Sequence, residues 1–164
     1  MRTNALDVKS WAILERLLTP TNALIVETML RTGLRVSDVL GIRTAQLKPR
    51  FTVSESKTGK RRRVSIGRKW CEVLQSQAGA CYVFEHAKDP TKHRTRQAVW
   101  HDVKRAAKAM RLPQNVAPHS ARKSYAVDEY RKSGSISKVC ERLNHDRIET
   151  TVLYLLDVIS GLGA

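Results

Sequence analysis

The stretch LNHDRIETTVLY, residues 143–154, decides how this chain is interpreted. Its apolar residues recur at helical spacing and predict a helix from about Glu149 to Leu156. The stretch also places His145 and Tyr154 nine residues apart. A tyrosine on an amphipathic helix is by default a core residue, so the stretch acquires a functional meaning only together with the rest of the chain.

Upstream of this stretch, a histidine and an arginine share one helix face. His119 and Arg122 are three residues apart near the start of a predicted helix over residues 118–133. Both side chains can donate hydrogen bonds to phosphoryl oxygens. Alone, the pattern H-x-x-R is weak, because it equally describes a helix-start histidine followed by a solvated arginine.

A second arginine lies in the segment TGLRVSD, residues 32–38. Gly33 is a typical helix stop, so Arg35 stands between two predicted helices. There its guanidinium can point at an anion, and Asp38 is placed to hold it. By itself, this segment is equally consistent with an ordinary surface arginine beside an aspartate, without any function.

Residues 51–66 predict a small antiparallel hairpin, with FTVSES and RRRVSI on either side of a Lys-Thr-Gly-Lys turn. Lys57 on this turn can reach a DNA strand and donate a proton. The alternative is a basic turn that only contacts backbone phosphates. We expect the phosphate contacts of the domain to come from Lys60, Arg61, Arg62, Arg63 and Lys123.

The remaining pattern is helical. Apolar periodicity with cap and stop signals predicts helices over 7–18, 20–32, 37–41, 68–78, 94–111 and 118–133, and from Ser135 or Ser137 to Leu143. Residues 79–93 have the composition of a strand-containing loop. The expected fold class is therefore α+β, mostly α-helical with one small antiparallel β-sheet, and 164 residues fit one domain.

The charge is concentrated in the middle of the chain. The net charge is +15, and residues 35–123 hold 21 of the 30 basic residues against six acidic ones. Such a region usually binds a polyanion, and nucleic acid is the leading candidate. An anionic membrane surface fits less well, because the basic residues form no amphipathic helix with a Trp/Phe/Leu face. A merely soluble basic surface is the third possibility.

Composition argues against several other classes. Cys71, Cys81 and Cys140 are an odd number with no C-x-x-C spacing, which is typical of free thiols in a reducing, cytoplasmic setting. Neither an export signal nor a membrane-length apolar stretch is visible. A zinc site built from Cys71 and Cys81 with His86 and His93 matches no standard spacing, so we expect no metal and no other cofactor.

In chain order, the segments TGLRVSD, SKTGK, H-x-x-R and LNHDRIETTVLY resemble the motifs of the tyrosine recombinase (phage-type integrase) family, over about Leu6 to Tyr154. The resemblance implies the catalytic-domain fold of that family, often found in phages and mobile elements. It implies an enzyme that cleaves and rejoins double-stranded DNA through a 3′-phosphotyrosine bond, without metal or ATP. It assigns the scissile phosphate to Arg35, His119 and Arg122, the nucleophile to Tyr154, the general acid to Lys57, support of the first arginine to Asp38, and the second histidine to His145.

These residue types suit that chemistry. Two arginines offer permanently protonated donor forks that can hold phosphoryl oxygens and stabilise the charge that develops in the transition state. A tyrosine has an ordinary pKa of about 10, so its hydroxyl must lose a proton to attack. We expect the cationic pocket to favour the phenolate and a nearby histidine to take or share the proton.

The chain departs from the family pattern in two ways. Leu143-Asn144-His145 stands where Leu-Gly-His is usual, and asparagine tolerates the same left-handed backbone. Typical members also carry a separate N-terminal DNA-clamping domain. We expect residues 1–164 to be a single catalytic domain without a separate N-terminal core-binding domain, and to be monomeric in the absence of DNA. Two alternatives stay open: a type IB topoisomerase, and a non-catalytic DNA-binding module with the same fold.

Overall fold

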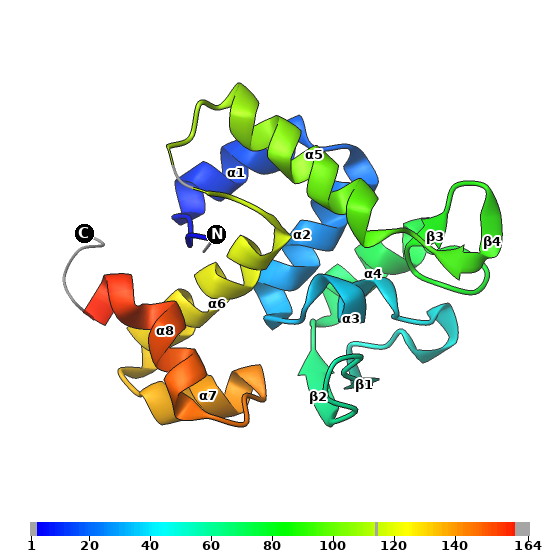
Figure 1. Cartoon of the computed structure of the whole chain (residues 1–164). Coiled ribbons are helices and arrows are strands. Elements are labelled where there is room, and N and C mark those ends of the chain that lie inside the picture. Colours follow the sequence, from blue (N-terminus) through cyan, green and yellow to red (C-terminus); the bar gives the residue numbers. More distant parts are fainter. Residues whose placement is uncertain (1–2, 114, 160–164) are drawn as a thin grey trace.

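The computed structural model describes residues 3–113 and 115–159, with side chains as far as Leu156. It confirms a mostly helical α+β architecture (Figure 1). The helices are α1 (Val8–Leu17), α2 (Pro20–Thr32), α3 (Val36–Leu40), α4 (Arg68–Gln77), α5 (Arg96–Ala109), α6 (Pro118–Ser133), α7 (Ile136–Leu143) and α8 (Ile148–Ile159), with a short 3-10 turn at Thr44–Gln46. The strands are β1 (Arg50–Ser54), β2 (Arg61–Ser65), β3 (Glu85–His86) and β4 (Asp89–His93).

The strands form two antiparallel hairpins, where the sequence predicted one sheet. β1 pairs with β2 in the predicted hairpin, from Arg50 opposite Ser65 to Ser54 opposite Arg61. β3 and β4 form a second two-stranded ribbon within the segment 79–93, which was expected to be a strand-containing loop. The sequence did not predict this ribbon, because its residues are all partly or fully exposed and show no apolar alternation.

Local signals account for most helix boundaries. Asp7 caps α1 through its carboxylate, and Gly33 ends α2 in a left-handed conformation at φ 65°. Ser135, rather than Ser137, caps α7. Thr19 stands at the N-cap of α2, where threonine often caps a helix, but its hydroxyl binds Asp102 of α5 at 2.9 Å instead of capping α2.

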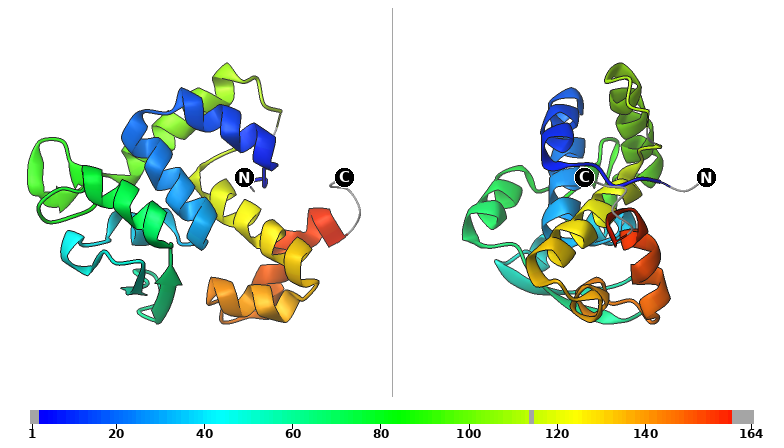
Figure 2. Two further views of the ribbon diagram at one scale, coloured as in Figure 1. Left: turned by 180° about the vertical axis from the view of Figure 1, so that it is seen from behind. Right: turned by 90° about the vertical axis from the view of Figure 1, so that its left-hand side faces the viewer.

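The main core lies around α2. Leu14, Ile25 and Met29 are fully or almost fully buried in a cluster to which α1, α2, α3, α4 and α5 and the β1–β2 hairpin contribute. A smaller cluster, which includes Val139 and Leu155, joins α6, α7 and α8. Figures 1 and 2 show α6 between α2 and the α7–α8 pair. In the part of the chain described, no helix has the length and apolar character needed to span a membrane.

The C-terminal end of α2 and the side of α6 approach each other closely at Gly33. A Cβ atom built on Gly33 lies 2.4 Å from the ring of Tyr125, where no side chain fits. The Gly33 carbonyl oxygen accepts a hydrogen bond from Arg122 of α6 at 2.7 Å. The glycine therefore allows both the helix stop and the contact that brings two candidate site segments together.

Gly33→Ala is expected to destabilise the protein far more than Gly134→Ala. Both glycines have a positive φ, which costs an L-residue about 1–2 kcal/mol. Only Gly33 adds a steric overlap, worth a further ~1–3 kcal/mol, because the space around Gly134 is open. Chemical denaturation of the two variants measures the difference. Equal losses in the free energy of unfolding would contradict the close approach.

Candidate active site

Tyr154 on α8 lies between the two predicted histidines. Its hydroxyl oxygen is 2.7 Å from Nε2 of His119, at the start of α6. Its ring centroid is 5.2 Å from the rings of both His119 and His145, and the ring planes are close to perpendicular. His119 is thus brought into one site with His145 and Tyr154, which lie much later in the sequence.

His145 lies in the loop between α7 and α8 and is held by a residue of α8. Its Nδ1 is 2.9 Å from the hydroxyl of the buried Thr151, one turn before Tyr154. Its Nε2 is buried and has no hydrogen-bond partner among the described residues. The preceding Asn144 adopts the left-handed conformation expected of it, at φ 55°. The second ring nitrogen of His145 is therefore available to a bound group.

Arg122 is fully buried beneath the site. Its Nη1 donates to the carbonyl oxygen of Gly33 and its Nη2 to that of Leu143, both at 2.7 Å. Its Nε is buried without a partner in the described part of the chain. Burial, and then the nearby charge of Arg35, lower the pKa of Arg122 to about 10, so the guanidinium stays charged at neutral pH. A buried charge with an unused donor is suited to an anionic ligand.

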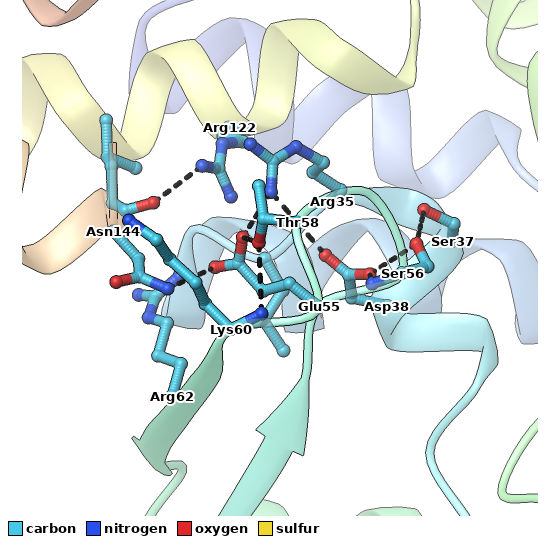
Figure 3. A network of polar contacts seen from close by, with 12 residues as sticks. Arg35, Ser37, Asp38, Glu55, Ser56, Thr58, Lys60, Arg62, Arg122 and Asn144 are labelled. Carbon is cyan, nitrogen blue, oxygen red and sulfur yellow. Dashed lines mark hydrogen bonds and ion pairs between the residues drawn. The ribbon is translucent and has the colours of Figure 1, made fainter. Parts of the chain in front are cut away.

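Arg35 is the residue before α3, and an acid that the sequence analysis missed holds it (Figure 3). Its Nη1 lies 2.5 Å from Oε2 of Glu55, but 3.9 Å from the predicted partner Asp38. Asp38 instead accepts hydrogen bonds from the backbone and the hydroxyl of Ser56. The signal for Glu55 was its position two residues after Val53, on the inward-facing side of β1.

The hairpin turn carries Lys57 at the edge of the site. Its side chain is exposed, and its charge contributes to the lowered pKa of His119. Lys60 on the same turn forms an ion pair with Asp146, the residue after His145. The turn and the α7–α8 loop are therefore joined beside Tyr154.

The predicted phosphate contacts divide into two groups. Lys60, Arg61 and Arg63 are exposed. Arg62 faces inward from β2 and donates to the carbonyl oxygen of Thr32 at 2.5 Å. Lys123 is 6% exposed, donates to a backbone carbonyl and lies 5.5 Å from the Tyr154 ring centroid. Strand alternation and helix packing thus place Arg62 and Lys123 away from the open surface.

The site keeps its histidines uncharged and its tyrosine protonated. Burial, and then the neighbouring cations, lower the pKa of His119 and of His145 to about 4. Burial raises the pKa of Tyr154, and the opposing effect of Arg122 and Arg35 is smaller. The cations favour the phenolate as expected, but in the unliganded site desolvation of the phenolate outweighs them, so the net pKa of Tyr154 is raised.

The cysteines and histidines weighed as metal ligands do not form a site. Cys71 is buried in the main core, whereas His86 and His93 lie on the β3–β4 ribbon. Among the described residues, no group of three or more His, Cys, Asp or Glu side chains is arranged to hold a metal ion.

Comparison with protein families identifies relatives over most of the chain. Residues 11–157 match the model of the phage integrase family. The chain is 32% identical over 130 residues to a tyrosine recombinase of Thermosipho africanus, which covers 75% of this chain and 45% of that protein. It is 26% identical over 159 residues to the tyrosine recombinase XerD of Mycobacterium tuberculosis, and the match covers 88% of this chain and 50% of that protein. The chain spans about half the length of these curated relatives.

Solved structures share the fold. A lambda integrase dimer bound to a COC′ core site matches with a TM-score of 0.77 at 19% identity, covering 94% of this chain and 48% of that one. The catalytic domain of bacteriophage HP1 integrase matches with a TM-score of 0.71 at 21% identity, covering 97% of this chain and 95% of that domain. The predicted catalytic-domain fold is therefore confirmed.

His119 and His145 are expected to titrate near pH 4 in the folded protein, well below the ordinary value of 6.5. Because an unfolded histidine binds its proton at the higher pH, these two residues should also reduce stability as the pH falls from about 6.5 towards 4. Proton NMR of the imidazole resonances, assigned with His119→Asn and His145→Asn, measures both values. Titration of both residues above pH 6 would refute the desolvated, cation-flanked site.

Proposed function

The chain belongs to the phage integrase family, and on this premise we propose that it is the catalytic domain of a site-specific DNA recombinase. The domain cleaves and rejoins double-stranded DNA through a covalent bond between Tyr154 and a 3′ phosphate. One observation carries the proposal: the Tyr154 hydroxyl oxygen lies 2.7 Å from His119 Nε2, in a pocket that also contains the cationic Arg35 and Arg122.

The scissile phosphate is bound by the two arginines and the second histidine. The Nε of Arg122 and the Nε2 of His145 are buried polar atoms without partners in the described residues. Arg35 contributes a partly exposed guanidinium to the same pocket. These donors hold the non-bridging oxygens and stabilise the additional negative charge of the pentavalent transition state.

The nucleophile is activated by proton transfer to His119. Since the pKa of Tyr154 is raised and that of His119 is lowered, the proton rests on the phenol before reaction. As the bond between the phenolic oxygen and phosphorus forms, Nε2 of His119 accepts this proton. The bond from phosphorus to the 5′ oxygen breaks, and Lys57 donates a proton to that oxygen. Rejoining reverses these steps, so the phosphotyrosine bond conserves the energy of the broken strand.

Several features support DNA as the partner. The excess of basic residues lies between Arg35 and Lys123, and Lys60, Arg61 and Arg63 point outward from the hairpin beside the site. The XerH recombinase and the lambda integrase, which share this fold, are solved with their difH and COC′ DNA sites. Because the curated relatives are named recombinases, we favour recombination over supercoil relaxation.

The DNA site is found first. The chain is incubated with a randomised plasmid library, the reaction is stopped with detergent, and protein-linked DNA ends are recovered and sequenced. A duplex with the recovered site and a nick just downstream of the cleavage position then traps the adduct, because the short 5′-hydroxyl fragment diffuses away. Rates are measured in single turnover.

Tyr154→Phe is expected to abolish the covalent adduct and to leave DNA affinity within about twofold of wild type, because only the attacking oxygen is removed. The matched control is Tyr82→Phe, which loses the same atom at a ring that packs on Arg43 and His93. The control should form adduct at the wild-type rate. Undiminished adduct with Tyr154→Phe would eliminate this residue as the nucleophile.

Lys57→Ala is expected to lower the cleavage rate on ordinary DNA by at least ~10²-fold, within the range for general-acid catalysis. Replacing the bridging 5′ oxygen with sulfur should restore most of the rate, because a thiolate leaves without protonation. Lys69→Ala, at an exposed lysine of α4, should leave the rates on both substrates unchanged. If the sulfur substrate is cleaved no faster than the oxygen substrate by Lys57→Ala, another residue is the acid.

A further inference from the structure

Glu55 is a buried carboxylate at the centre of the polar network in Figure 3. Only 1% of its surface is exposed. Its Oε2 accepts from Nη1 of Arg35 at 2.5 Å and from the hydroxyl of Thr58 at 3.2 Å, and its Oε1 accepts from Nδ2 of Asn144 at 3.3 Å. Burying a carboxylate is costly unless it is paired. Both oxygens of Glu55 are therefore committed to defined partners.

The contact with Glu55 fixes one nitrogen of Arg35 and leaves the rest of the fork for a ligand. Both acidic contacts of Arg35, to Glu55 and to the more distant Asp38, use Nη1. A guanidinium has five N–H donors in a rigid plane, so anchoring Nη1 orients the others. The Arg35 side chain remains 20% exposed, which leaves part of it accessible to a phosphate.

Asn144 connects this pair to the loop that presents His145. It ends α7 in a left-handed conformation, a position that glycine also fills. Only a side chain can donate to Glu55, however, and the next residue is His145. The shared carboxylate therefore connects the position of Arg35 to the position of His145.

We propose that Glu55 is a positioning residue for catalysis. It orients Arg35 on the scissile phosphate and, through Asn144, holds the His145 loop in a fixed position relative to Arg35. The inference rests on the proposed recombinase function. Glu55 does not touch the DNA in this scheme. It acts through the direction in which it holds the Arg35 guanidinium.

Glu55→Gln and Asn144→Gly test the two halves of the network. A glutamine has one acceptor oxygen in place of two, so it can accept a hydrogen bond from Arg35 or from Asn144, but not from both in the observed geometry. Asn144→Gly preserves the left-handed backbone and removes only the donor. We expect cleavage to fall at least tenfold with Glu55→Gln and about threefold with Asn144→Gly, with DNA affinity unchanged. Rates within twofold of wild type for Glu55→Gln would overturn the proposal.

A modified substrate separates positioning from general structural damage. A methylphosphonate replaces one charged oxygen of the scissile phosphate with a methyl group. If Glu55 acts by placing Arg35 on that oxygen, the loss with Glu55→Gln should shrink below threefold on at least one methylphosphonate isomer. The matched control is Asp102→Asn, which alters a buried carboxylate bound to Thr19 and Asn22 on the far side of the core. Equal losses with Glu55→Gln on phosphate and methylphosphonate would show a merely structural role.

A measurement without DNA keeps this inference separate from the proposed function. In wild-type protein, the two Nη signals of Arg35 should be resolved by nitrogen NMR, because the bond to Glu55 hinders rotation of the guanidinium. Arg35→Lys assigns the signals. Glu55→Gln should average them, because an amide oxygen binds the guanidinium more weakly than a carboxylate does, whereas Asp102→Asn should not. Absence of any wild-type DNA adduct would refute the recombinase function alone, whereas averaged Arg35 signals in wild type would refute the role of Glu55.

Discussion

The buried guanidinium of Arg122 is the interaction on which the rest of the site depends. It is fully enclosed and bonded to the carbonyl oxygens of Gly33 and Leu143, which end α2 and α7. Removing such a charge from water costs several kcal/mol, and a fixed set of acceptors must offset that cost. Arg122 therefore requires both helices to end where they do. Gly33 permits the first of these ends by its positive φ and its missing side chain.

The same charge contributes, after burial, to the protonation states around it. Burial lowers the pKa of His119 and of His145 most, and the charges of Arg122 and Arg35 lower it further, so both histidines rest as neutral imidazoles. The charge of Arg122 favours the phenolate of Tyr154, but less strongly than burial favours the phenol. In the proposed reaction, a phosphate contributes the missing negative charge to the pocket. The site then binds its anion with fixed donors, while one proton moves from Tyr154 to His119 and another from Lys57 to the leaving 5′ oxygen.

Local sequence signals predicted most of the fold because caps, stops and apolar periodicity act within a few residues. The helix over residues 118–133 and the stop at Gly33 are examples. The candidate residues His119, Arg122, His145 and Tyr154 were found from their ordered motifs, and the structure brings them together. Strand alternation indicates the inward direction of Glu55 and Arg62, but the partners of these side chains and the burial of Lys123 depend on tertiary packing, which no local pattern contains. The β3–β4 ribbon has no apolar alternation from which its strands could be predicted.

The most direct test of Tyr154 as the nucleophile is the identity of the residue that becomes attached to DNA. The trapped adduct is digested with nuclease and trypsin, and the peptides are sequenced by mass spectrometry. Cleavage after Arg147 releases residues 148–164, which contain a single tyrosine. We predict a nucleotide on Tyr154 in this peptide. A nucleotide on any other residue, such as Tyr125 or Tyr130 of α6, would contradict it.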